Sequence, residues 1–405
     1  MKILIVSPWY PWPPFDGGRI RVLETLRYLS SHHQVTLLAT VTRAEEADDG
    51  GRLQEICEHV ETSVLSPGAW PVARRLAKGL LGRMPVVQNF YHDPRLAERV
   101  RRLTSRHDYD VIQIEFSYAA SYVRSVDPGC GAKTVLSMHN VESLRFGREV
   151  NLGQRVDRRF AAAWDRTFHG LWEEQAIRTF DGIVSVSEPE RAWVLARVPQ
   201  AMVELIPNGV DTDHFRPQVP PDPPAPPRLV FTGAMHYPPN VDAALWFTER
   251  IWPRLRHLVP DLCFEIVGRD PDPRVVALGR TPGVVVTGAV ADVRPYIARA
   301  RAVVVPLRAG AGTRLKILEA MAMARPVVST ALGAEGLTIA PGRNILIADD
   351  AEGFAAHVLA LLGSAERAAL LGQAGRHLVE ARYRWSRCLE GLERLYGRLL
   401  GRRAA

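Results

Sequence analysis

Residues 308–330, RAGAGTRLKILEAMAMARPVVST, combine residue types that suit the binding of an anion. An apolar strand is expected over residues 302–306, followed by a glycine-containing turn and a helix that carries Arg314, Lys316 and Glu319. Backbone N–H groups at a helix start attract anions, whereas cations there oppose the helix dipole unless an anion neutralises them. The segment therefore predicts a diphosphate site, with Glu319 accepting hydrogen bonds from ribose hydroxyls. The alternative is an ordinary loop and helix with solvated cations.

Two features near strand ends in the first half of the chain also suit a ligand site. Gly17 and Gly18 follow a first strand and precede a helix, where glycine lets a ligand approach the backbone closely; alternatively they only form a turn. His139 ends the strand in KTVLSMHN, so it is expected at the carboxyl edge of a sheet. There it would orient a substrate hydroxyl or phosphate, or transfer a proton. The alternative for His139 is a structural role, bonded to the backbone.

Polar residues after two later strands are candidates for contact with a second substrate. Ser187 is expected to cap a helix, and Glu188 is either an ordinary first-turn residue or a substrate contact. Asn208 lies in the turn sequence IPNGVD, which either shapes a hinge or contacts substrate.

Bulk composition narrows the class of protein. A chain of 405 residues suits two domains, and a formal net charge of +7 favours anionic partners such as nucleotides, phospholipid headgroups or nucleic acid. The four cysteines are scattered, which argues against a disulfide framework or a structural zinc site and favours a reducing cytosol. We find no signal-peptide pattern and no apolar run long enough to span a membrane. A cytoplasmic location is expected, with peripheral contact at the inner face of the membrane left open.

The order of strands and helices predicts the architecture. Buried strands alternate with helices in both halves of the chain, which is typical of doubly wound α/β sheets. Residues 216–228 are rich in proline and read as an extended linker. We therefore expect Rossmann-like domains over residues 1–215 and 229–380, facing a central cleft, and a C-terminal helix over 381–405 that crosses back to the first domain. Residues 70–90 have the profile of a basic interfacial helix or of an ordinary amphipathic helix.

Taken together, these pieces resemble glycosyltransferase family 4, whose members are retaining enzymes of the GT-B fold. The resemblance extends over nearly the whole chain. It rests on GAGTRLKILEAMAMARPVVST with GAEGL after it, on IPNGVDTDHF, on the Gly17–Gly18 loop and on Trp385 with its helix. The sequence FTGAMHYPPNVDAALWF is most similar to bacterial exopolysaccharide-associated sugar transferases.

The resemblance implies that the C-terminal domain binds a nucleotide-diphosphate sugar and that the acceptor is a glycan or a lipid-linked glycan. No metal or other cofactor is expected. Glu319 matches the family's ribose-binding glutamate, and His139 matches the histidine near the donor sugar and acceptor. The expected catalytic residues are His139, Arg314 and Lys316. The expected donor-binding residues are Gly17, Gly18, Gly233, Tyr296, Gly310, Gly312, Thr313, Leu315 and Glu319. Ser187, Glu188 and Asn208 are expected on the acceptor side.

Two departures from the family pattern shape the hypothesis. The first glutamate of the family's pair should lie eight positions before Glu319, and that position is Ala311. The family's Arg and Lys pair after the first strand of the second domain is also missing, because the sequence there is GAMHYPPN. We expect Arg314 and Lys316 to supply the missing charge. The alternatives are a non-catalytic nucleotide-binding scaffold protein and a GT-B-fold sugar-nucleotide epimerase; no nucleic-acid-binding module is recognisable.

Overall fold

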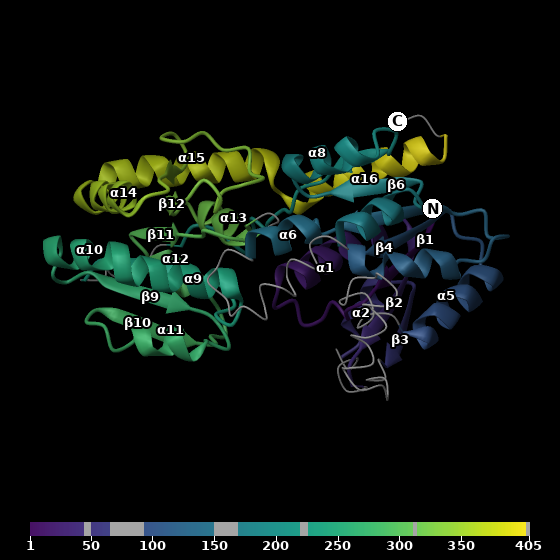
Figure 1. The fold of residues 1–405 in the computed structure, drawn as a ribbon, viewed down its shortest axis with the longest axis horizontal. Coiled ribbons are helices and arrows are strands. Elements are labelled where there is room, and N and C mark those ends of the chain that lie inside the picture. Colours follow the sequence, from purple (N-terminus) through teal and green to yellow (C-terminus); the bar gives the residue numbers. More distant parts are fainter. Residues whose placement is uncertain (44–49, 65–92, 150–168, 219–225, 311–313, 402–405) are drawn as a thin grey trace. The chain divides into compact units, whose positions relative to one another are not determined.

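A computed structural model describes residues 1–43, 50–64, 93–149, 169–218, 226–310 and 314–401 of the chain (Figure 1). The described residues form two compact units. The first contains the chain up to Pro207 and again from Ser386, and the second contains Asn208–Trp385. The predicted basic helix over residues 70–90 lies outside the described residues, as does the central part of the predicted linker.

The first unit is built on a seven-stranded parallel sheet. Its order is β3-β2-β1-β4-β5-β6-β7, so the direction of winding reverses between β1 and β4. The strands are β1 (Lys2–Ser7), β2 (Gln34–Val41), β3 (His59–Val64), β4 (Val111–Glu115), β5 (Lys133–Met138), β6 (Gly182–Ser185) and β7 (Val203–Leu205). Apolar side chains from Ile3 to Val6 are all fully buried, as expected when helices cover both faces of a parallel sheet.

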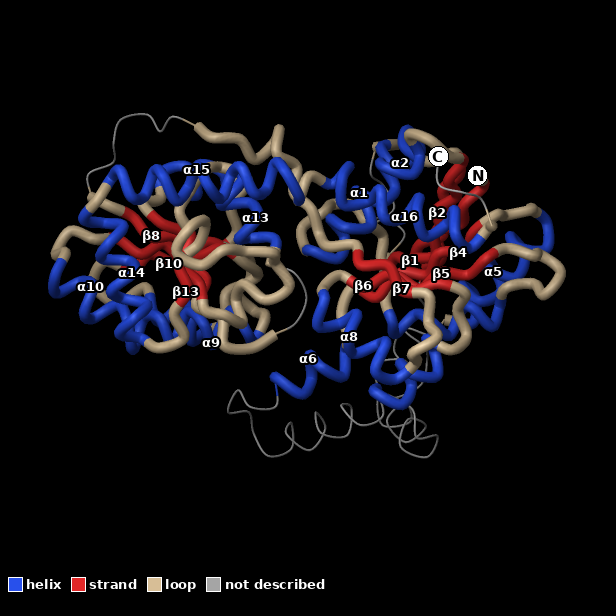
Figure 2. The backbone as a smooth tube through the Cα atoms, turned by 90° about the horizontal axis from the view of Figure 1, so that it is seen from above, coloured by secondary structure: helices blue, strands red, loops and turns tan. Residues whose placement is uncertain are grey.

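Helices cover both faces of this sheet. The helices of the unit are α1 (Gly17–Ser30), α2 (Arg52–Ile56), α5 (Pro94–Arg106), the 3-10 helix η2 (Ser117–Ser125), α6 (Glu142–Glu149), α8 (Glu188–Arg197) and α16 (Trp385–Leu399). Residues 169–177 are also helical. In Figure 2, α1 and α16 lie on one side of the sheet and α5 and α8 on the other.

The C-terminal helix α16 packs tightly against the sheet of the first unit. A Cβ atom at Gly182 would lie 2.9 Å from Leu399, and one at Gly391 would lie 2.8 Å from Ile206. Glycine on the strand and glycine on the helix therefore allow the two elements to approach closely. Exposed ion pairs from Arg394 and Arg398 to Glu204 border this contact.

The second unit repeats the same winding with six parallel strands. The order is β10-β9-β8-β11-β12-β13, and the reversal falls between β8 and β11. The strands are β8 (Arg228–Thr232), β9 (Cys263–Val267), β10 (Val284–Gly288), β11 (Ala302–Val305), β12 (Val327–Ser329) and β13 (Leu346–Ile347). Both sheets confirm the predicted class, two Rossmann-like α/β domains.

Eight helical segments accompany the second sheet among the described residues. They are α9 (Pro238–Trp246), the π-helical η3 (Phe247–Ile251), α10 (Trp252–Leu258), α11 (Pro273–Leu278), α12 (Arg294–Arg299), α13 (Leu315–Ala322), α14 (Ala351–Gly363) and α15 (Ala365–Arg382). The sequence predicts one continuous helix from Asn240 to Leu255, but the structure inserts the π turn η3. Pro253 lacks the N–H that an α-helical bond needs, and a π turn relieves the mismatch.

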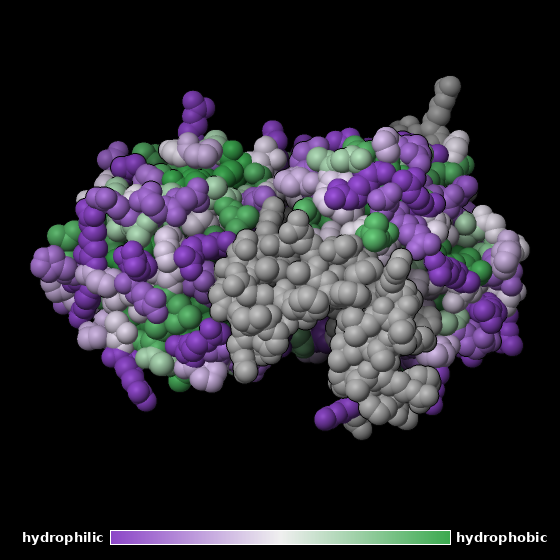
Figure 3. All heavy atoms as spheres, in the orientation of Figure 1, coloured by the Kyte–Doolittle hydropathy of each residue, from purple (hydrophilic) through white to green (hydrophobic). Residues whose placement is uncertain are grey.

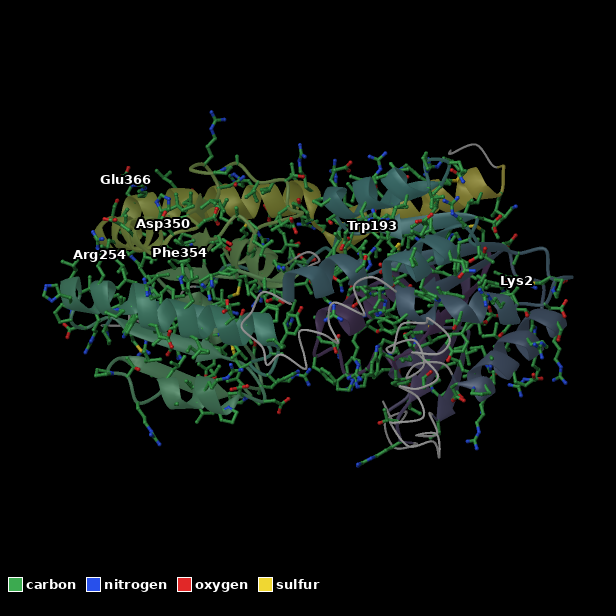
Figure 4. All side chains as sticks on the ribbon, in the orientation of Figure 1. Lys2, Trp193, Arg254, Asp350, Phe354 and Glu366 are labelled. Carbon is green, nitrogen blue, oxygen red and sulfur yellow. The ribbon has the colours of Figure 1, made fainter. Side chains whose placement is uncertain are left out.

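Helices α14 and α15 pack into the core of the second unit. Asp350 caps α14 by accepting a hydrogen bond from the N–H of Gly353, and the fully buried Phe354 contacts the rings of Phe247 and Trp246 edge-on (Figure 4). Among the described residues, no single helix has the length and apolar content needed to cross a membrane; α14 and α15 pass that test only together, bent by 107° at their junction. On the face in Figure 3, hydrophilic residues surround smaller hydrophobic areas.

The boundary between the units differs from the prediction. Residues 208–215, expected in the first domain, belong to the second unit. The N–H of Val210 donates to the carbonyl of Tyr383 at 2.7 Å, and the guanidinium of Arg376 donates to the carbonyls of Thr212 and Phe215. Residues 216–218 and 226–227 of the predicted linker are not helical. The backbone contacts that decide the boundary leave no local sequence signal.

Candidate active site

The reversal point of the second sheet gathers the predicted cations and carboxylate. Lys316 lies on the first turn of α13, and its Nζ donates to Oδ1 of Asn240 at 2.8 Å. The same ammonium lies 4.4 Å from the centre of the Phe231 ring, a cation–π contact. Asn240 is itself held by a hydrogen bond from Nδ2 to the carbonyl of Ala234 at 2.9 Å. The ammonium is therefore fixed at the carboxyl end of β8, where ligands bind in doubly wound sheets.

Two glycines let the backbone close around this ammonium. A Cβ atom at Gly233 would lie 2.8 Å from Nζ of Lys316, and one at Gly268 would lie 1.6 Å from the carbonyl oxygen of Gly233. Gly233 also has a φ of 153°, which side-chain-bearing residues rarely adopt. Any side chain at either position would displace the strand end that carries the site.

Arg314 directly precedes α13 and occupies its N-cap position. Its side chain is buried, and a Cβ atom at Gly310 would lie 2.9 Å from its Nη2. Gly310 has a φ of 107°, so the turn and the guanidinium depend on each other. A buried guanidinium at the start of a helix places positive charge where backbone N–H groups already favour an anion.

The electrostatics of the second unit favour an anionic ligand at this place. Burial, together with the nearby charge of Arg314, lowers the pKa of Lys316 to about 7. Burial raises the pKa of Glu319 to about 7, although the charge of Lys316 partly opposes this effect. Two cations thus repel each other in a poorly solvated region, and a bound diphosphate would relieve that repulsion.

The first unit places His139 directly after β5 at the carboxyl edge of its sheet. Its Nε2 lies 2.6 Å from Oε2 of Glu115, the last residue of β4. Both side chains are buried. The ring of His139 also stacks on Phe116, with ring centres 3.7 Å apart and planes at 16°. The predicted histidine is therefore held by a carboxylate on its edge and an aromatic ring on its face.

Phe116 occupies the space beside the glycine pair. A Cβ atom at Gly18 would lie 2.8 Å from the Phe116 ring, so glycine at this position makes room for an aromatic side chain of the protein. Gly17 and Gly18 begin α1, which is capped by the side chain of Asp16. Phe116 has a φ of 70°, a left-handed conformation that is uncommon for a bulky residue. His139, Phe116 and Gly18 thus form one contact group at the reversal point between β1 and β4.

Comparison with known proteins matches both halves of the chain to glycosyltransferases. Residues 15–214 match the family model described as Glycosyltransferase Family 4, and residues 226–364 match the model described as Glycosyl transferases group 1. Together the two matches span most of the chain.

The chain is a glycosyltransferase of the family 4 type.

Two relatives match most of the chain, and one of them is a named glycosyltransferase. A protein of Klebsiella pneumoniae, described as an uncharacterized 44.6 kDa protein in the cps region, is 22% identical over 88% of this chain and 90% of its own length. The GDP-mannose-dependent α-(1-6)-phosphatidylinositol monomannoside mannosyltransferase of Mycolicibacterium smegmatis is 28% identical over 77% of this chain and 83% of its own length.

Solved structures share the fold of this glycosyltransferase. Sucrose-phosphate synthase of Thermosynechococcus elongatus superposes with a TM-score of 0.75, at 18% identity, over 99% of both chains. HepE of Anabaena, solved in complex with UDP and glucose, superposes with a TM-score of 0.67, at 16% identity, over 97% of this chain and 98% of its own.

Two further predicted donor residues of the glycosyltransferase lie on the second unit. Leu315 is the first residue of α13, and Tyr296 lies on α12, where its ring is 4.3 Å from the guanidinium of Arg299. Gly312 and Thr313 lie outside the described residues, as does Ala311.

The predicted acceptor-side residues are divided between the two units. Ser187 occupies the predicted N-cap position of α8, but its side chain forms no capping hydrogen bond, whereas Glu188 forms an exposed ion pair with Arg191 at 3.0 Å. Asn208 belongs to the second unit, so its placement in the first domain was wrong. The Glu188 pair is the ordinary first-turn role that the sequence left open.

The glycosyltransferase contains three Asp-x-Asp sequences, at residues 108–110, 211–213 and 270–272, a pattern that can hold a metal beside a nucleotide. In the first, Asp110 accepts a hydrogen bond from the backbone N–H of Lys2. In the second, Asp211 accepts hydrogen bonds from two backbone N–H groups that follow it. In the third, Asp272 caps α11 and pairs with Arg274. Among the described residues, no group of three or more His, Cys, Asp or Glu side chains is arranged to hold a metal ion.

Sequence reasoning missed Asn240 and Glu115, the two residues that hold Lys316 and His139. A signal for Glu115 exists: Gln113 and Glu115 interrupt an otherwise apolar strand, and polar groups in a buried strand require partners. Asn240 lies in a proline-containing helix start that gives no such indication.

Proposed function

We propose that this glycosyltransferase is a retaining enzyme that moves a sugar from a nucleotide-diphosphate sugar to a glycan or lipid-linked acceptor in exopolysaccharide or cell-envelope glycan synthesis. The observation that carries the proposal is the group formed by Arg314, Lys316 and Glu319 at the reversal point of the second sheet. The cps-region relative and the mannosyltransferase relative support the pathway class. The UDP complex of HepE supports a nucleotide-sugar donor.

The two cations suit the departure of a nucleoside diphosphate. Negative charge grows on the leaving phosphate oxygen as the bond from the sugar C1 atom breaks. Fixed cations and a helix start that already face this position stabilise that charge without rearranging, which is the most effective form of electrostatic catalysis. Arg314 and Lys316 thus take the place of a divalent cation, and we propose that the reaction is independent of metal.

Glu319 is proposed to hold the ribose of the donor. The carboxylate lies one helical turn beyond Lys316, on the same short helix. Ribose hydroxyls donate hydrogen bonds best to an ionised carboxylate, so binding would lower the pKa of Glu319 from about 7. The helix α13 would then contact two parts of one nucleotide.

Retention follows if the acceptor attacks from the face that the diphosphate leaves. The bond from C1 to the phosphate oxygen breaks, the bond from C1 to the acceptor oxygen forms, and the acceptor proton passes to the departing phosphate oxygen. This route requires no strong protein base. We propose that the first unit binds the acceptor and that His139 orients a sugar or acceptor hydroxyl.

Nucleotide binding can be tested by thermal shift with UDP, GDP, ADP and dTDP, each with and without magnesium. A ligand that binds only the folded state raises the melting temperature by mass action. At a ligand concentration 100 times its Kd, the free energy of unfolding rises by about 2.7 kcal/mol. We expect one nucleotide to stand out, with the same shift in magnesium and in EDTA. A protein that melts cooperatively but responds to none of the four would favour the non-catalytic scaffold.

The stereochemical proposal needs the product itself. With the responding nucleotide's α-linked sugar donor and a mixture of simple acceptor glycosides, we expect the new linkage to be α, as read by the anomeric proton coupling in NMR. A β-linked product would rule out retention while leaving the transferase assignment intact. Conversion of the free donor to another sugar, without transfer, would instead indicate the epimerase.

A further inference from the structure

We propose that Tyr396, Gln113 and Glu115 form a buried hydrogen-bonded relay that fixes the tautomer and orientation of His139. In this relay they are positioning residues, and His139 is the group that meets the substrate. The inference deepens the proposed function and rests on it for the role of His139. It assigns to the C-terminal helix α16 a part in the reaction of the first unit.

The relay is continuous from α16 to the carboxyl edge of the sheet. The hydroxyl of Tyr396 lies 2.6 Å from Oε1 of Gln113, and Nε2 of Gln113 lies 2.6 Å from Oε1 of Glu115. The other carboxylate oxygen of Glu115 lies 2.6 Å from Nε2 of His139. All four side chains are buried, with residue exposures between 0% and 7%. Bulk water therefore does not compete for these bonds.

The direction of every bond in the relay is determined by chemistry. An ionised carboxylate can only accept, so Gln113 must present its amide N–H to Glu115 and turn its oxygen toward Tyr396. The Tyr396 hydroxyl must then donate. For the same reason His139 must carry its proton on Nε2. A neutral imidazole protonated there leaves the lone pair on Nδ1.

The charges around the relay keep Glu115 ionised and His139 neutral. Burial alone would raise the pKa of Glu115, but the hydrogen bonds from His139 and Gln113 and the charge of the buried Arg21 on α1 lower it overall. Burial lowers the pKa of His139 and outweighs the opposite effect of Glu115. Arg21 further lowers that pKa and Asp16, before α1, raises it.

Two other groups face this cluster. Glu190 on α8 and Cys388 on α16 act on Arg21, whose charge balances that of Glu115. Burial raises the pKa of both, to about 7 for Glu190 and about 12 for Cys388. At neutral pH Glu115 therefore holds a full negative charge opposite the guanidinium of Arg21, Glu190 is about half ionised, and Cys388 is neutral.

With Nε2 bonded to Glu115, Nδ1 is the ring atom of His139 that can accept a hydrogen bond from a substrate. In the part of the chain that the structure describes, Glu115 is the only group hydrogen-bonded to this imidazole. Phe116 covers one face of the ring and Glu115 holds one edge. The lone pair on Nδ1 then suits acceptance of a hydrogen bond from a substrate hydroxyl, and it would not suit contact with a phosphate oxygen.

The first test is spectroscopic and needs no substrate. With ¹⁵N-labelled histidine, and with the His139 signals assigned by their loss in His139→Asn, we expect the wild-type ring to be the Nε2–H tautomer. Glu115→Gln should give a mixture of tautomers and lower the pKa of His139, because Glu115 raises it. Glu115→Asp should restore the wild-type tautomer in part. A wild-type ring protonated on Nδ1 would overturn the relay.

The far end of the relay is tested by Tyr396→Phe, with Tyr122→Phe as the matched control. Tyr122 is equally buried in the same unit, and its hydroxyl accepts from the N–H of Asp93, outside the relay. Tyr396→Phe should lower kcat about 3- to 10-fold and Glu115→Gln about 100-fold, both with unchanged donor KM, since an orienting carboxylate acts through its histidine. Tyr122→Phe should change thermal stability and leave kcat unchanged. Equal kcat values for the two tyrosine variants would overturn the role of α16.

The two tests separate this inference from the proposed function. If the wild-type protein transfers no sugar, the proposed function fails, and the tautomer of His139 still decides whether the relay exists. If transfer occurs but Glu115→Gln leaves both the tautomer and kcat unchanged, only the relay fails. If the Glu115→Gln variant does not fold, Tyr396→Phe decides whether the relay affects kcat, because this substitution removes one hydroxyl and no charge.

Discussion

Replacing Arg314 with alanine is expected to weaken nucleoside diphosphate binding by about 10- to 100-fold, equivalent to roughly 1.5–3 kcal/mol for the loss of charge-assisted hydrogen bonds. The guanidinium is buried at the N-cap position of α13, so an anion there would be bound in a poorly solvated place. Part of the loss should be offset, because removing Arg314 also removes the charge that lowers the pKa of Lys316. Titration calorimetry with the nucleotide that responds in the thermal shift measures the change directly.

Arg308→Ala is the matched control for this substitution. Arg308 lies on the same segment, but its guanidinium is already paired with Asp242 at 2.6 Å and is half exposed. Its removal should change nucleotide affinity by less than about threefold, because exposed ion pairs contribute little. Arg314→Lys should fall between the two, since lysine keeps the charge and loses the planar fork. Unchanged affinity in Arg314→Ala, in a variant that melts like the wild type, would remove Arg314 from the donor site.

The fold could be predicted because its signals are local. Most strands of the two sheets are short apolar runs, and runs such as residues 3–6 must be buried on both faces. Strand β3, with the sequence HVETSV, is an exception. In each half of the chain, the order of these runs and of the helices between them then predicts a doubly wound sheet. The predicted cations and carboxylate, at the start of α13 and on it, also lie within a few residues of one another, so one segment of sequence was enough to suggest them.

The partners of the site residues could not be predicted, because they come from distant segments. Asn240 lies 76 residues before Lys316, and Tyr396 lies 283 residues after Gln113. These atoms come together only when the strands pair into sheets and α16 packs against the first sheet. Neither contact can be predicted from the spacing of neighbouring residues. The boundary at Pro207 has the same origin, since it depends on backbone bonds to residues near 376 and 383.

Nucleotide affinity is expected to fall as the pH rises from 8 to 9.5, by about tenfold per pH unit if binding takes up one proton. The pKa of Lys316 is about 7 in the free protein, so this amine is mostly neutral in that range. A diphosphate beside the amine would raise its pKa, and binding at high pH must therefore protonate it. Over the same range Glu319, with a pKa of about 7, is already ionised, and so is a phosphate group with a second pKa near 6. Lys316 is thus the group whose protonation is expected to determine how steeply nucleotide affinity falls with pH.

Two substitutions at Lys316 separate the charge from its titration. Lys316→Arg keeps a cation that does not titrate below about pH 12, so its affinity should be nearly constant between pH 8 and 9.5. Lys316→Met should also give a flat profile, but at the weak affinity that the wild type approaches at high pH. Arg314→Ala should move the wild-type fall to higher pH, because Arg314 lowers the pKa of Lys316. A wild-type profile as flat as that of Lys316→Arg would mean that the ammonium does not face the bound phosphates. The charge at Arg314 would then have to carry the diphosphate alone.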